Sequence, residues 1–68
     1  MEPTLKLLRV NKGFNQDELG EKLGVSQTTV SAWEQREAKP NAKNIYKLAK
    51  IYAVEPTVIF NTIFKQKT

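Results

Sequence analysis

The sequence predicts an all-α protein of five short helices in one domain, residues 1–68. Three observations support this fold class. Residues 16–36 carry the caps and the turn of two consecutive short helices. Apolar residues recur at helical spacing after residue 44, and 68 residues leave room for only one hydrophobic core.

The first helix is expected to begin at residue 3 or 4 and to end at residue 11 or 12, because Gly13 is a stop signal. Leu5 and Leu8 should face the core. Phe14 precedes the next helix as an apolar residue and is also assigned to the core.

The second helix should begin near Gln16. Asn15 and Glu18 have the spacing of a capping box, in which each side chain bonds the other residue's backbone N–H. Leu19 and Leu23 form a narrow apolar stripe four residues apart. Gly24 then supplies the left-handed conformation that commonly ends a helix.

The third helix should be capped by Ser26, with Val25 packing on Val30 as a hydrophobic staple. At about 100° per residue, Val30 and Trp33 share one side of this helix. The opposite side is small, polar and uncharged, and comprises Thr28, Ser31, Ala32 and Gln35, with Gln27 at the exposed amino-terminal edge.

A loop containing Pro40 follows, and Asn41 should cap a fourth helix. The core side of this helix is expected to include Ile45, Leu48, Ala49 and Tyr52, with Tyr46 on that side or at its edge. The opposite side carries Lys43, Lys47 and Lys50, most of which should be a solvated face.

The fifth helix should open at Glu55 and Pro56, since proline at the first helical position loses no hydrogen bond. Val58, Ile59 and Phe60 are expected to complete the core. Residues 62–67 are undecided between helix and strand, although Thr62–Phe64 favour strand by their intrinsic propensity.

Composition limits the functional classes. The chain has 11 Lys and Arg against 7 Asp and Glu, and a net charge of +4 favours a polyanionic partner. His and Cys are absent, so no catalytic site, metal site or cofactor is expected, and the protein should not be an enzyme. No apolar segment approaches the ~20 residues of a membrane span, which predicts a cytoplasmic protein without membrane contact.

Residues 16–36 resemble the helix-turn-helix of bacterial and phage Cro/C1-type transcriptional regulators, also called the xenobiotic-response-element type. The resemblance extends from about residue 5 to residue 60. It depends on the spacing of Gln16, Leu19, Gly20, Gly24, Val30 and Trp33. The chain departs from the family pattern at Gly20, where small Ala is commoner, and at Gln35-Arg36, where Asn-Gly is usual.

The resemblance implies a compact lambda-repressor-like domain that binds double-stranded DNA, with helix-turn-helix residues 16–35. The third helix would enter the major groove by its amino-terminal end, where Gln can bond adenine and methyl groups can touch thymine. The expected base-contacting residues are Gln27, Thr28, Ser31 and Ala32. The expected phosphate-contacting residues are Lys12, Gln16, Gln35, Arg36, Lys39, Asn41 and Lys43.

The family also pairs an arginine at the position of Arg9 with a glutamate at the position of Glu34; otherwise Arg9 would be a solvated surface residue. The predicted function is a repressor that binds a palindromic operator as a homodimer through residues 57–67, including Phe60, Ile63 and Phe64. Ile63 and Phe64 could instead fold back on the monomer. The alternative function is an antitoxin-like protein-interaction module with secondary DNA binding.

Overall fold

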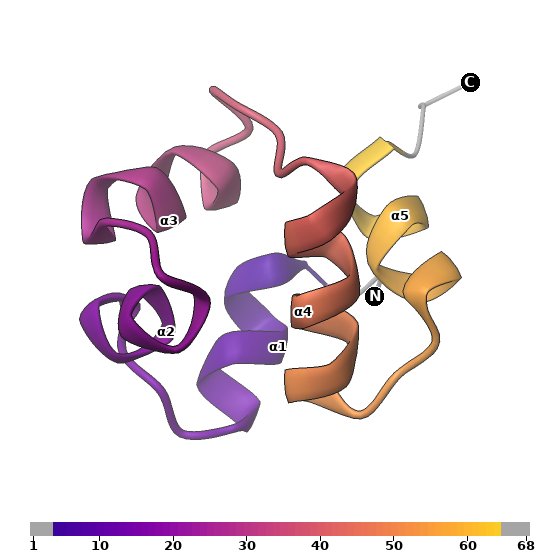
Figure 1. Ribbon diagram of the computed structural model, residues 1–68, viewed down its shortest axis with the longest axis horizontal. Helices are drawn as coiled ribbons and strands as arrows, with labels where there is room; N and C mark the ends of the chain where they lie inside the picture. The colour runs from indigo at the N-terminus through magenta and orange to yellow at the C-terminus, as the bar shows by residue number, and fades with distance from the viewer. Residues whose placement is uncertain (1–3, 65–68) are drawn as a thin grey trace.

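The computed structural model describes residues 4–64, which form helices and connecting turns without a strand. The helices are α1 (Leu5–Asn11), α2 (Gln16–Leu23), α3 (Gln27–Glu34), α4 (Ala42–Tyr52) and α5 (Pro56–Phe64). Figure 1 shows α2 and α3 on one side, α4 and α5 on the other, and α1 between them. The prediction of an all-α, five-helix fold is confirmed.

The core lies where the five helices meet, and every helix contributes to it. Its buried apolar side chains are Leu5, Leu19, Leu23, Val30, Trp33, Ile45, Leu48, Ala49, Tyr52 and Ile59. Leu8 and Phe14 pack against this cluster and are half-buried. The helical stripes that the spacing predicted in α2, α3 and α4 are therefore the sides that face inward.

The predicted N-caps are confirmed. The side chains of Asn15, Ser26 and Asn41 each accept a hydrogen bond from the backbone N–H three residues later, at 2.8, 3.1 and 2.9 Å. Glu18 accepts from the backbone N–H of Asn15 at 2.9 Å and completes the capping box. Thr4 caps α1 in the same way, so the helix begins at Leu5 rather than at residue 3 or 4.

The turn between α2 and α3 explains the unusual Gly20. A Cβ atom at this position would lie 2.7 Å from the backbone oxygen of Val25, a distance that real Cβ atoms essentially never show. Gly24 ends α2 with φ +78°. The carbonyl of Gly20 accepts from the backbone N–H groups of both Gly24 and Val25, at 2.8 and 2.9 Å. The chain thus folds back tightly on α2, and this close approach offsets the ~1 kcal/mol that glycine costs inside a helix.

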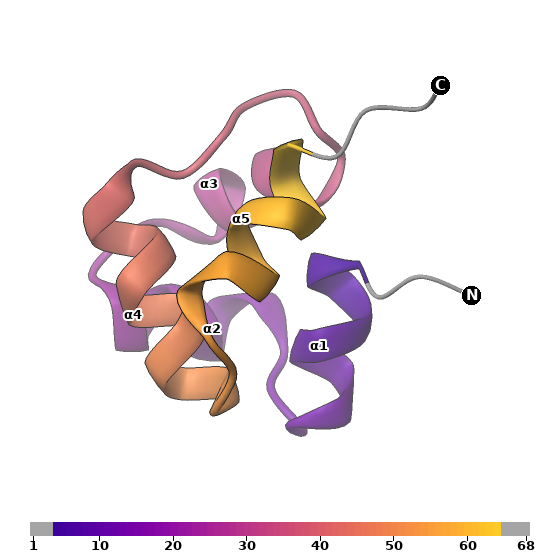
Figure 2. The ribbon, with the colours of Figure 1, turned by 90° about the vertical axis from the view of Figure 1, so that its right-hand side faces the viewer.

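α3 ends at Glu34, and Arg36 adopts the left-handed conformation that the family usually gives to glycine, with φ +64°. Its guanidinium donates to the backbone carbonyl of Thr62 at 3.3 Å. Figure 2 shows the end of α5 lying beneath the loop that follows α3. The loop is therefore connected to the last turn of α5.

The structure corrects two expectations about α5. Thr62–Phe64 are helical, so their strand propensity is overridden, and the Thr62 hydroxyl donates to the carbonyl of Val58 at 2.7 Å. Residues 65–67 lie outside the described residues. Of the three consecutive apolar residues, only Ile59 is fully buried; Val58 is half-buried and Phe60 is 52% exposed. Neighbours in a helix differ in direction by about 100°, so three in succession cannot all face the core.

Two residues of α4 also differ from expectation. Lys47 is half-buried, and its ammonium group donates to the carbonyl of Leu23 at 3.2 Å, which caps the end of α2. Tyr46 is 64% exposed, whereas Tyr52 is buried as predicted. Among the described helices, none combines the length and apolar character needed to cross a bilayer.

Candidate nucleic-acid interface

The outer side of α3 is presented to solvent because its inner side is anchored in the core. Val30 and Trp33 are 1% and 7% exposed. On the opposite side Gln27 and Thr28 are exposed, while Ser31 and Ala32 are half-buried. The four predicted base-contacting residues therefore lie together on the outer side of one helix, with the exposed pair at its amino-terminal end.

An ion pair holds the end of α3 against α1. The Arg9 Nε atom lies 2.6 Å from Glu34 Oε2, and a second guanidinium nitrogen donates to Glu34 Oε1 at 3.1 Å. The two side chains are only 9% and 6% exposed. The hydrogen bond from Arg9 to Glu34 raises the pKa of Arg9 above its usual value despite the cost of burial. This pairing confirms the family-derived expectation, and Arg9 is not a solvated surface residue.

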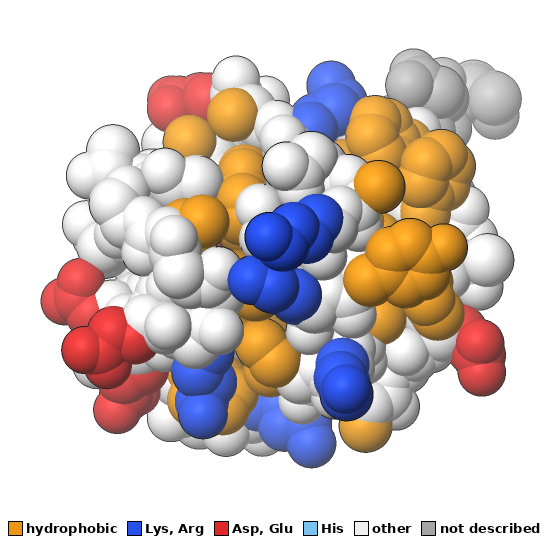
Figure 3. Space-filling model, viewed as in Figure 1, with side chains coloured by type: hydrophobic (Ala, Val, Ile, Leu, Met, Phe, Trp, Pro, Cys, Tyr) orange, Lys and Arg blue, Asp and Glu red, His pale blue; other side chains and the backbone are white. Residues whose placement is uncertain are grey.

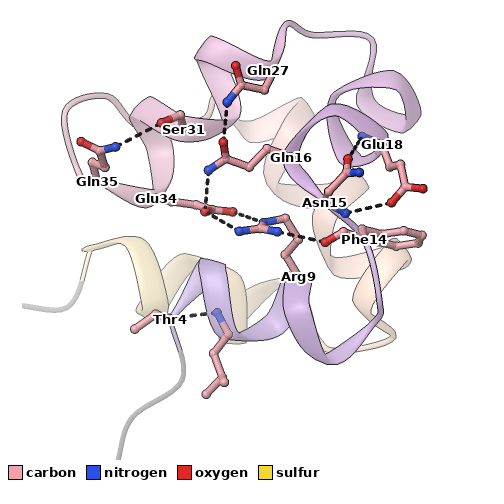
Figure 4. A network of polar contacts seen from close by, with 11 residues as sticks. Thr4, Arg9, Phe14, Asn15, Gln16, Glu18, Gln27, Ser31, Glu34 and Gln35 are labelled. Carbon is pink, nitrogen blue, oxygen red and sulfur yellow. Dashed lines mark hydrogen bonds and ion pairs between the residues drawn. The ribbon is translucent and has the colours of Figure 1, made fainter.

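Gln16 connects this ion pair to the amino-terminal end of α3. Its amide nitrogen donates to Glu34 Oε1 at 3.0 Å, and its amide oxygen accepts from the side chain of Gln27. Figure 4 shows the resulting series of contacts from Arg9 through Glu34 and Gln16 to Gln27. The exposed Gln27 amide is thereby connected to a buried charge pair.

The sequence reasoning assigned Gln16 to a phosphate but missed its contact with Gln27. Eleven residues separate the two glutamines, and only the fold brings their amides together. A weak signal was present: both are long amides at the first position of consecutive helices.

The predicted phosphate-contacting residues come from several elements, and the end of α1 lies at the bottom of Figure 1 whereas α3 lies at the top. They come from the C-cap of α1, the start of α2, the segment after α3 and the start of α4; all are exposed except the half-buried Gln16. Several already have partners within the chain: Asn41 caps α4, and Gln35 donates to the Ser31 hydroxyl at 3.2 Å. Figure 3 shows Lys and Arg side chains in the middle and at the top of the face, beside the mostly uncharged surface over α3.

Tyr52 is a buried polar residue near this network whose role the sequence did not reveal. Its hydroxyl has no hydrogen-bond partner among the described residues. Burial, and secondarily the charge of Glu34, raises the pKa of Tyr52 to about 12. The neutral phenol is therefore strongly favoured in the folded protein.

A helix-turn-helix with an anchored inner side, a polar outer side and surrounding cations is the architecture of a DNA-binding domain. A family model described as Helix-turn-helix matches residues 5–59. The chain belongs to the Cro/C1-type helix-turn-helix family of transcriptional regulators.

Three curated relatives are similar to this chain. The HTH-type transcriptional regulator DicA of Escherichia coli (strain K12) is 32% identical over 65 residues, covering 94% of this chain and 48% of the relative. The HTH-type transcriptional activator BcrR of Enterococcus faecalis is 36% identical over 50 residues, covering 74% of this chain and 24% of the relative. The uncharacterized HTH-type transcriptional regulator MJ0272 of Methanocaldococcus jannaschii is 37% identical over 60 residues, covering 88% of this chain and 91% of the relative.

The chain thus spans about half of the first relative and a quarter of the second, but most of the third. No solved structure matches the sequence.

Proposed function

We propose that this protein represses transcription by binding a palindromic operator as a homodimer, with α3 of each subunit in the major groove. The observation that supports this proposal best is the exposed Gln27 amide, held by Gln16 at the amino-terminal end of α3. A positioned side chain loses less conformational entropy when it contacts a base, so the network favours discrimination between bases.

The chemistry of α3 favours operators with A·T pairs in each half-site. A glutamine amide can bond adenine N6 and N7 together, and the methyl groups of Thr28 and Ala32 can touch the thymine methyl. The outer side of α3 has no arginine to bond guanine. The cations around it would contact phosphates and orient the helix without reading sequence.

A surface suited to dimerisation lies on the side formed by α4 and α5. Phe60 is 52% exposed and stacks on Phe64, with ring centroids 4.5 Å apart. Both rings line a groove of about 480 Å³ between α4 and α5. Tyr46, which is 64% exposed, lines this groove too. Figure 3 shows apolar side chains gathered on the α4–α5 side. Exposed apolar clusters of this kind are typical of protein interfaces.

The proposed dimer contact is centred on Phe60 and Tyr46. Ile63 and Phe64, which we also predicted at the interface, are half-buried against the subunit's own core. Their contribution to a dimer would therefore come from the parts of their side chains that remain exposed.

Selection of bound duplexes from a random DNA pool tests the function directly. We expect enrichment of an inverted repeat with A·T pairs in each half-site, whose halves are about one helical turn apart. A pool that shows no enriched sequence after several rounds would contradict sequence-specific binding. An enriched single half-site would contradict the palindromic, dimeric part of the proposal.

A further inference from the structure

A second pocket lies on the side of the molecule where α1, α3 and α5 converge. It has a volume of about 250 Å³ and opens between the first turn of α1, the end of α3, the loop after it and the end of α5. Its apolar walls come from Leu5, Trp33 and Ile63. Pockets for drug-sized ligands start at about 300 Å³, so this one suits a smaller molecule.

The charges at this pocket favour an anion. Arg36 and Lys39 line it, and neither pairs with a carboxylate within residues 4–64. The carboxylate that also lines it belongs to Glu34, which is already bonded by Arg9 and Gln16. The unbalanced charges are therefore the two cations.

Both cations are placed at the pocket by contacts with α5. The Arg36 guanidinium donates to the Thr62 carbonyl at 3.3 Å, which uses only one of its donor groups. The Lys39 ammonium lies 5.8 Å from the ring centroid of Phe64, in cation–π range. Cationic groups beside an apolar wall can hold a carboxylate while its hydrocarbon part enters the pocket.

We propose that this pocket binds a small organic anion with an apolar body, such as an aromatic carboxylate, and that the bound anion weakens DNA binding. The second part rests on the proposed function, in which Arg36 and Lys39 contact DNA phosphates. An anion that occupies these two cations competes with the phosphates. Because coupling between two ligands is reciprocal, bound DNA must weaken the binding of the anion by the same factor.

Trp33 gives a direct measurement of the first part, because it is the chain's single tryptophan and lines the pocket. The unmodified protein is titrated with benzoate and, separately, with benzamide, its neutral amide of the same shape, at constant ionic strength. We expect the Trp33 emission to change saturably with benzoate, with a Kd on the order of 1 mM, as the efficiency of a small ligand allows. Benzamide should bind at least about tenfold more weakly, because it lacks the charge-assisted contacts. Equal responses to both compounds, or no saturation with benzoate, would overturn the site.

Matched variants separate the pocket from general charge. Lys39→Gln should weaken benzoate binding about tenfold, as expected for the loss of one charged contact. Lys50→Gln removes the same charge from an exposed α4 residue that does not line the pocket, and it should bind benzoate unchanged. An equal loss in both variants would mean that benzoate responds only to net charge, which would overturn the assignment.

The effect on DNA is read in a separate experiment. At a benzoate concentration that saturates the pocket, and at constant ionic strength, operator affinity should fall, and benzamide at the same concentration should leave it unchanged. Unaltered operator affinity would overturn the regulatory coupling. Because the fluorescence titration contains no DNA, failure of the proposed function and failure of the anion site are distinguishable.

Discussion

Gln16 and Gln27 are bonded through their side-chain amides, so the first residue of α2 positions the first residue of α3. Gln16 is in turn bonded to Glu34, the last residue of α3. The Gln16 side chain therefore contacts both ends of α3. This arrangement makes the orientation of Gln27 dependent on a residue outside α3.

Gln27→Ala should relax base preference within each half-site, at a cost of about 1–3 kcal/mol of discrimination. Lys43→Ala, which removes a predicted phosphate contact, should weaken binding to all DNA sequences about equally. Competition between the operator and point-mutated operators measures both effects. Gln16→Ala should reduce discrimination in the same direction but less, because the base-contacting amide remains. Equal losses on operator and random DNA for Gln27→Ala would exclude this residue as a reader.

Arg9→Met should lower the free energy of unfolding by about 3 kcal/mol, because it leaves the carboxylate of Glu34 buried without its charged partner. The double variant Arg9→Met with Glu34→Leu should recover much of this loss. Urea denaturation followed by circular dichroism measures the unmodified protein, the two single variants Arg9→Met and Glu34→Leu, and the double variant. Strictly additive losses would show that the two charges are not energetically coupled.

The DNA affinity should depend strongly on salt. If four cationic side chains of each subunit contact phosphates in a dimer, the log–log slope of the association constant against salt concentration should be roughly −7. Titrations of a labelled operator between low and physiological salt measure it. A slope near zero would contradict a phosphate-contacting role for the residues around α3.

Phe60→Asp should give a folded monomer that binds a palindromic operator much more weakly. Since Phe60 is half exposed, a carboxylate there can be solvated in the monomer but not in an apolar interface. Sedimentation and circular dichroism measure assembly and folding separately. Ile59→Asp is the contrasting variant and should unfold, because Ile59 is fully buried. If the unmodified protein is a monomer at tens of micromolar, the α4–α5 groove is not a dimer contact. The groove would then bind a different protein, as the antitoxin alternative requires.

High pH should destabilise the folded protein through Tyr52. Its folded pKa of about 12 exceeds the ordinary value of 10.0, so the neutral phenol stabilises the fold fully below pH 10, and this contribution is lost as the pH rises toward 12. Tyr52→Phe is the control, because it removes the ionisable hydroxyl and keeps the buried ring. The variant should lose less stability than the unmodified protein between pH 9 and 11. Parallel losses would contradict an important role for Tyr52.

Local features of the fold could be predicted because their hydrogen bonds close within a few residues. Asn15, Ser26 and Asn41 each cap the helix that begins one residue later, and Gly24 ends α2 by its own backbone conformation. The stripes of α2 and α3 were also predictable, since their apolar residues are few and unambiguously spaced.

Longer-range features were not predictable from spacing. The bond from Lys47 to Leu23 joins residues 24 positions apart, and nothing local to α4 distinguishes Lys47 from its neighbouring lysines. The phase of α5 was ambiguous because three apolar residues in succession fit several orientations. The contact of Gln16 with Gln27 depends on the crossing of α2 and α3, which sequence spacing does not determine.

The tight approach at Gly20 means that the turn leading into α3 lies against α2 by a contact between backbone atoms and not between side chains. Side chains can change conformation to absorb a substitution, but two backbones in contact cannot. A larger residue at position 20 would therefore push this turn away from α2 and change the orientation of the whole of α3. On DNA, such a variant should lose discrimination at every base pair of the half-site. A substitution on the outer side of α3 should instead lose discrimination at a single position.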